Sequence, residues 1–286
     1  MNNMEKDLSK IIQDLREYIE KREDILMAFV FGSQVKGTTT LESDFDIAVY
    51  FKPKTGVLEY EDDIFYEGET EIWNDLEKMV ERRVDFVVLN RVPAILSFPI
   101  INKGIAIIIK DRSIYLKFLL IVSSLAEDFR RFIRDFKEIK ARSASLTPED
   151  EDRLIKLTDF LERELNDYEK YENIDFKIYE DNREKRRSME RWVENIINVS
   201  IDIAKILLAS EKKQIPDTYV DTVNLLAILN NFNEEISQKM ASFVKLRNLM
   251  AHEYLDLRFS QIQEFIKEVK IYRYLTEYTD NFLKKN

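Results

Sequence analysis

Two aspartates separated by one residue follow a Gly-Ser pair at a fixed distance. Gly32 and Ser33 end an apolar run, ten residues intervene, and Asp44 and Asp46 open the next apolar run. Side chains alternate across a strand, so both carboxylates project to one side and repel each other unless a cation lies between them. Mg²⁺ suits such a pair, because it is usually held by one or two carboxylates plus substrate phosphates. The pattern therefore predicts metal-assisted transfer of a nucleotidyl group.

Three other residues could complete this site. Asp85 starts a later apolar strand and can bring a third carboxylate to the same edge. Gly32 lets the backbone approach a phosphate closely, and the Ser33 hydroxyl with neighbouring N–H groups can bind that phosphate. Taken separately, the acid pair and the Gly-Ser turn are also typical of solvated loops. Their combination between strands favours a site.

A second candidate site contains the only histidine of the chain. Arg247 precedes His252 by five residues, at the end of an amphipathic pattern. A histidine can move protons near neutral pH, and the planar arginine fork can neutralise a phosphate. These groups would suffice to cleave RNA without a metal. Five residues of helix separate two side chains by about 140°, so the pair meets only if the helix ends between them or if two copies face each other in a dimer. The alternative is a surface histidine at a helix end.

The elements that must position these residues differ between the two halves of the chain. Short apolar or alternating runs predict strands at 25–31, 44–51, 84–89 and 104–110, with helices at 4–22 and 69–83. Beyond residue 112 helical patterns take over, with helices expected at 148–173, 183–210, 218–229, 232–250 and 259–283. We expect an α+β fold in which a small mixed sheet precedes an all-α bundle. The predicted domains are 1–140 and 150–286, joined by a linker at 141–149 where Thr147 and Pro148 start a helix.

The segment FGSQVKGTTTLESDFDIAVYF resembles the minimal nucleotidyltransferases of the polymerase-β superfamily, whose hallmark is Gly-Ser, ten residues, Asp-x-Asp and a later third Asp. The resemblance covers residues 1 to about 117. It implies that Asp44 and Asp46 bind Mg²⁺, that Asp85 joins them or acts as base, and that Gly32 and Ser33 hold the triphosphate of ATP.

The segments at 186–208 and 243–257 resemble HEPN domains, specifically the toxin partner of minimal nucleotidyltransferases. That family carries an Arg-x4-His-x-Tyr motif. The resemblance implies that Arg247 and His252 form a ribonuclease pair, with Asn248 nearby. It also places Tyr254 where the cognate nucleotidyltransferase adenylylates the toxin and silences it.

Together the two resemblances predict a fused toxin–antitoxin module that transfers AMP to Tyr254, with ATP and RNA as partners and a homodimer formed through the helical half. One alternative is an aminoglycoside-type nucleotidyltransferase whose helices bind a small-molecule acceptor. Another is a non-enzymatic dimerisation module. Basic residues between 183 and 191 and between 130 and 140 could bind RNA phosphates, although interleaved acids also fit a solvated helix face.

Composition limits the remaining possibilities. The net charge of −10 argues against a histone-like or ribosomal-protein-like chain, and 45% hydrophobic residues argue against general disorder. Five Gly and five Pro favour long helices over sandwiches and barrels, and the absence of Cys excludes disulfides and thiolate chemistry. The first residues lack the apolar core of a signal peptide, and we expect a cytoplasmic protein that does not span a membrane.

Overall fold

The computed structural model describes residues 3–36, 44–54, 56–142, 146–252 and 259–285, and it gives only the backbone of residues 3–7, 36, 251 and 252. The chain forms two compact units, Met1–Arg130 and Arg131–Asn286. The division falls within the helix α5 (Arg112–Ala141). The domain boundaries at 140 and 150 remain a prediction.

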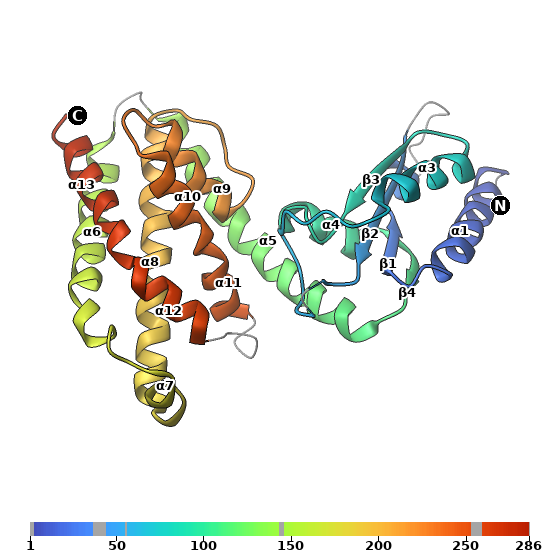
Figure 1. The fold of residues 1–286 in the computed structure, drawn as a ribbon. Coiled ribbons are helices and arrows are strands. Elements are labelled where there is room, and N and C mark those ends of the chain that lie inside the picture. Colours follow the sequence, from blue (N-terminus) through green and yellow to red (C-terminus); the bar gives the residue numbers. More distant parts are fainter. Residues whose placement is uncertain (1–2, 37–43, 55, 143–145, 253–258, 286) are drawn as a thin grey trace. The chain divides into compact units, whose positions relative to one another are not determined.

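The first unit contains a mixed four-stranded sheet (Figure 1). Its strands are β1 (Ile25–Val30), β2 (Phe45–Phe51), β3 (Val84–Val88) and β4 (Ile105–Ile109), all close to their predicted positions. The spatial order is β3-β2-β1-β4. β1 pairs antiparallel with β2 and β4, whereas β2 and β3 are parallel. The end of β1 and the starts of β2 and β3 therefore meet at one edge of the sheet.

Each face of the sheet has its own apolar core. Alternate β2 residues, such as Ile47 and Val49, join a cluster that includes α1 (Asn3–Glu20) and α3 (Glu69–Val80). The residues between them, Ala48 and Tyr50, join a cluster on the other face with α4 (Ala94–Lys103) and the first half of α5. Because Asp46 alternates with Ile47, its side chain belongs to the α4–α5 face.

The second unit is helical, as predicted. Its described helices are α6 (Pro148–Asn166), η1 (Tyr168–Lys170), α7 (Phe176–Asp181), α8 (Arg183–Ser210), α9 (Tyr219–Asn224), η2 (Leu225–Ile228), α10 (Glu234–Ser242), α11 (Val244–His252), α12 (Phe259–Glu268), η3 (Val269–Ile271) and α13 (Tyr272–Leu283). α8 is central, since α6, α7, α9, α11 and α12 all pack against it. Buried apolar residues of α8, from Met189 to Ala209, form the core of the bundle.

Local sequence signals set several helix boundaries. The Thr147 side chain accepts a hydrogen bond from the N–H of Asp150 and caps α6, with Pro148 at the first position as predicted. Asn182 caps α8 by accepting from the N–H of Lys185. The helices α4 and α7 were not predicted, because α4 is apolar on most sides and contains Pro99, and α7 has only six residues.

Of the helices that the structure describes, none combines the length and apolar character needed to cross a bilayer.

Candidate functional site

The edge where β1 ends and β2 begins requires a glycine. Gly32 has a φ of +70°, a left-handed conformation that L side chains rarely adopt. A Cβ atom at this position would lie 2.0 Å from Oδ2 of Asp46. The neighbouring N–H of Phe31 donates to the backbone carbonyl of Asp46 over 3.1 Å, which fixes the two segments together. Gly32 therefore leaves room for the Asp46 carboxylate.

The structure brings the predicted carboxylates to this edge. In the parallel pairing of β2 and β3, Asp46 lies opposite Asp85, and Asp44 is exposed just before β2 begins. Burial raises the pKa of Asp46, and the charges of Asp85 and Asp44 raise it further. A hydrogen bond from the backbone of Ser33 partly offsets this increase. The site thus gathers carboxylates around the half-buried Asp46 and disfavours its charged form.

These residues fit a divalent cation whose remaining coordination positions are filled by a substrate. Within the described ranges, no three His, Cys, Asp or Glu side chains are grouped closely enough to hold a metal ion by themselves. The donors at the edge are carboxylate oxygens, and the repulsion that raises the pKa of Asp46 is what a bound cation would offset. Mg²⁺ usually takes one or two carboxylates and fills its remaining positions with water and phosphate oxygens. Metal binding by Asp44, Asp46 and Asp85 remains a prediction.

The backbone of Ser33 contacts the carboxylate site. This residue begins the short helix α2 (Ser33–Lys36), and its backbone forms a hydrogen bond with the Asp46 side chain. Next to it, Nε2 of Gln34 is buried and has no hydrogen-bond partner within the described part of the chain. Binding of a triphosphate by Gly32 and Ser33 remains a prediction, and most of the loop that follows lies outside the described residues.

In the helical unit, Arg247 is held from three sides. Its Nε donates to Oδ1 of Asn198 in α8 over 3.0 Å, and one terminal nitrogen donates to Oδ1 of the buried Asn248 over 3.1 Å. Its guanidinium carbon lies 5.0 Å from the centre of the Tyr219 ring in α9. The second terminal nitrogen has no partner among the described residues, so a planar donor remains for a phosphate.

Asn198 was missed by the sequence analysis, although a signal was present. It is a polar residue within the apolar segment INVSIDI of α8, and Asp202 lies one turn further along the same helix. A half-buried amide at such a position needs a hydrogen-bond partner, and Arg247 is that partner. The sequence alone does not show which distant residue this will be.

The predicted partner of Arg247 lies on the same helix. The backbone of α11 is helical from Val244 to His252, so the helix does not end between Arg247 and His252. A meeting of the two side chains across a dimer remains a prediction. The side chain of His252 and all of Tyr254 lie outside the described residues.

A network of charged residues surrounds the buried Lys205 in the same unit. Lys205 is only 4% exposed, and its ammonium contacts Asp135 at 2.7 Å and Asp202 at 2.9 Å. Asp135 also pairs with Arg153 at 2.8 Å. Burial would raise the pKa of Asp135, but its hydrogen bonds to Arg153 and Lys205 lower it to about 2. The network connects α5, α6 and α8.

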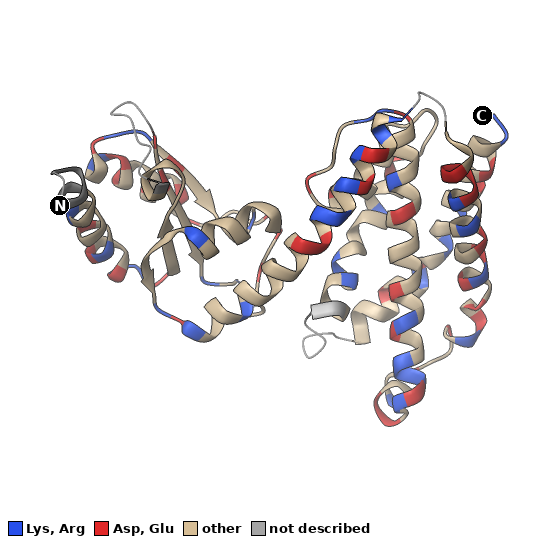
Figure 2. Cartoon of the chain, turned by 180° about the vertical axis from the view of Figure 1, so that it is seen from behind, with Lys and Arg blue, Asp and Glu red and all other residues tan. Residues whose placement is uncertain are grey.

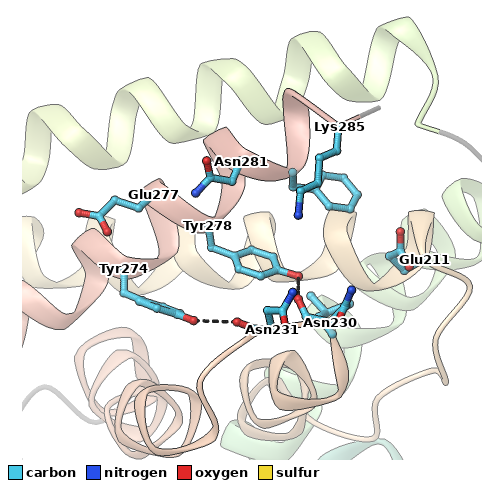
Figure 3. Close-up of a pocket in the computed structure, with 10 residues that line it drawn as sticks. Glu211, Asn230, Asn231, Tyr274, Glu277, Tyr278, Asn281 and Lys285 are labelled. Carbon is cyan, nitrogen blue, oxygen red and sulfur yellow. Dashed lines mark hydrogen bonds between the residues drawn. The ribbon is translucent and has the colours of Figure 1, made fainter.

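A separate hollow of about 550 Å³ lies between α13 and the turn before α10 (Figure 3). The hydroxyls of Tyr274 and Tyr278 donate to the backbone carbonyls of Asn231 and Asn230. None of the predicted site residues lines it, and we assign it no role.

A small mixed sheet with Gly-Ser and three aspartates at one edge is the arrangement expected of a nucleotidyltransferase, and a helical bundle with an Arg-x4-His helix is the one expected of a HEPN domain. Two family models agree. One described as polymerase beta nucleotidyltransferase matches residues 13–113, and one described as HepT-like ribonuclease matches residues 161–280. One chain thus joins a domain of each family.

No curated protein matches the sequence. One similar solved structure, described as a toxin–antitoxin with AMP-PNP, has 18% identity and a TM-score of 0.35, and it covers 48% of this chain and 97% of its own. Two described as mutants of the toxin–antitoxin MntA-HpeT have 16% and 19% identity and TM-scores of 0.34, and they cover 48% of this chain and 97% and 96% of their own. TM-scores at this level do not establish a shared fold.

Proposed function

We propose that the chain is a fused toxin–antitoxin module. Its first domain transfers AMP from ATP to Tyr254, and this modification silences a metal-independent endoribonuclease built on Arg247 and His252. The observation that supports the proposal is the match of both family models within one chain. The chemistry of each half follows from its predicted site residues.

In the transferase reaction, the Tyr254 oxygen attacks the α-phosphorus of ATP. The bond from this phosphorus to the bridging oxygen breaks, pyrophosphate leaves, and the tyrosine proton passes to a base, for which Asp85 is our candidate. Asp44, Asp46 and Asp85 would hold Mg²⁺, which supplies neutralisation of the phosphate charge when bound. Gly32 keeps the space beside Asp46 open.

In the ribonuclease reaction, the 2′-hydroxyl of RNA attacks the adjacent phosphorus and the 5′-oxygen leaves. His252 moves the protons, and Arg247 neutralises the charge that develops on the phosphate. Because α11 is continuous through both residues, we propose a homodimer in which Arg247 of one copy acts beside the partner's α11. AMP on Tyr254 would place a bulky anion two residues from His252 and repel RNA.

The test is mass spectrometry of the intact protein and its peptides, before and after incubation with ATP and Mg²⁺. We expect AMP on Tyr254, and we expect none in the Asp44→Ala/Asp46→Ala variant, whose expression should be toxic. Relief of that toxicity by His252→Ala would assign it to the ribonuclease. Absence of self-modification, together with labelling of an added aminoglycoside, would instead support a small-molecule acceptor.

A further inference from the structure

Three arginines form a stripe along the exposed part of α8. Arg183, Arg187 and Arg191 are spaced four residues apart and are all exposed. At about 100° per residue, they lie within about 80° of one another around the helix, and Asn198 falls inside the same arc. The arginine stripe, defined as these three residues, therefore continues along one face of α8 to the residue that binds Arg247.

The spacing along the helix suits an extended polyanion. With a rise of about 1.5 Å per residue, the guanidinium groups are anchored about 6 Å apart, and the stripe begins about 22 Å from Asn198. Extended single-stranded RNA presents its phosphates in a comparable row. Arginine is well suited to this row because its planar fork binds phosphate through two parallel hydrogen bonds.

Most of the charge on the stripe is available. Arg183 and Arg187 form no ion pair with any described residue. Arg191 pairs with Glu194 at 3.0 Å, but the arginine side chain is 68% exposed, and such surface pairs contribute little. Acidic residues are interleaved with the basic ones on this part of α8 (Figure 2). One of them, Glu190, lies at the edge of the arc that the stripe occupies, about 20° from Arg183, and its carboxylate accepts a hydrogen bond from Tyr179 in α7.

The same end of the bundle carries an exposed aromatic ring and the first residue of α12. Phe176 of α7 is 60% exposed, and its ring lies 5.8 Å from that of Phe259. Phe259 begins α12, seven residues after His252, and also contacts Tyr179 at 4.8 Å. A basic groove or stripe beside an aromatic ring is the usual combination for binding single-stranded nucleic acid, because bases stack on such rings.

We propose that the arginine stripe binds the backbone of single-stranded RNA and leads it to Arg247. The inference rests on the proposed ribonuclease, because it assigns a substrate path to that site. Phe176 would stack a base at the far end of this path.

The test measures RNA binding separately from cleavage. The full chain carrying His252→Ala and Asp46→Asn is titrated against a fluorescently labelled single-stranded RNA, and anisotropy is read at several salt concentrations. We expect Arg183→Glu/Arg187→Glu to weaken binding at least about tenfold and to reduce the slope of log affinity against log salt by about 1.4, the value for two phosphate contacts on a single strand.

A matched control is available on the same helix. Lys185 is also exposed and lies between the two arginines, but it points about 160° away from Arg187. Lys185→Glu should therefore change affinity less than about threefold, whereas Arg187→Glu makes the same charge change on the stripe. Equal effects of these two variants would overturn the stripe and indicate attraction by overall charge only.

The outcomes distinguish the stripe from the ribonuclease itself. Stripe-dependent binding by a chain that never cleaves RNA would support the stripe and refute the ribonuclease. RNA cleavage can also be measured in the Asp44→Ala/Asp46→Ala chain, with and without Arg183→Glu/Arg187→Glu. An unchanged cleavage rate would refute the stripe alone. If the parent chain does not bind RNA at all, both proposals are wrong.

Discussion

Asp46 of β2 and Asp85 of β3 lie opposite each other in the parallel register of the sheet. Parallel pairing brings the starts of two strands to the same edge, although 38 residues of chain separate these aspartates. Burial and the neighbouring charges raise the pKa of Asp46. The carboxylate therefore retains its proton to higher pH than an exposed aspartate, and a cation must compete with that proton.

This competition predicts a pH-dependent affinity for Mg²⁺. We expect Mg²⁺ to bind more weakly at about pH 5 than at about pH 7.5, since a larger fraction of Asp46 is protonated at the lower pH. Calorimetric titration in the presence of a non-hydrolysable ATP analogue measures the affinity. Asp85→Asn should lower the pKa of Asp46 and move the pH dependence to lower values. The same affinity at both pH values would contradict this account.

Gly32→Ala should reduce AMP transfer at least about a hundredfold, because displacement of a reacting group by about 1 Å has an effect of this size. The added Cβ atom would overlap Oδ2 of Asp46. Gly56→Ala is the matched control, since Gly56 has a similar φ of +74° but no atom within 4 Å of the added Cβ. Both variants carry the backbone strain, and only Gly32→Ala moves the carboxylate. Equal losses of activity would indicate strain rather than overlap.

Asn198→Ala should lower RNA cleavage about ten- to a hundredfold, because a hydrogen bond to a charged group contributes about 1.5–3 kcal/mol and Arg247 would lose its contact with α8. Asn195→Ala is the control on the same helix, since Asn195 donates to Glu164 instead. Cleavage rates of both variants in the unmodified chain make the comparison. A similar decrease in both would point to a general weakening of α8.

Asp135→Asn should destabilise the helical unit by about 2 kcal/mol, because among the described residues it would leave Lys205 with Asp202 as its only carboxylate partner. The loss is smaller than for a fully buried pair, since Asp135 is partly exposed. The pKa of Asp135 falls to about 2 on folding. Its contribution is therefore complete above the unfolded value of about 3.9 and is lost as pH falls towards 2. Urea unfolding at several pH values measures the difference from the parent chain, which should shrink below about pH 4.

Lys205→Met is the complementary variant. Removal of one partner of a buried ion pair usually destabilises a protein, because the other charge is left without compensation. Here that cost is reduced, because Asp135 retains Arg153 and Asp202 is partly exposed to solvent. We expect a smaller loss of stability than in Asp135→Asn. A larger loss would show that the ion pairs of Lys205 stabilise the bundle by more than the burial of its charge destabilises it.

The strands of the sheet and the position of Asp46 could be predicted from sequence because apolar alternation and the Gly-Ser spacing are local signals. The contact between Arg247 and Asn198 could not, since it joins residues 49 positions apart and depends on how α11 packs against α8. The helix predicted at 232–250 is in fact α10 and α11, which meet near Phe243. A break of this kind leaves the apolar period almost unchanged, so periodicity did not reveal it.

The presence of both family domains in one polypeptide also fixes their ratio. Separate proteins can be synthesised or degraded unequally, so a cell can release one from the other by changing their amounts. Within a single chain, translation always supplies one domain for each copy of the other. Under the proposed function, the chemical state of Tyr254 would have to set the activity, and the balance between its modification and its reversal would replace the balance between two protein concentrations.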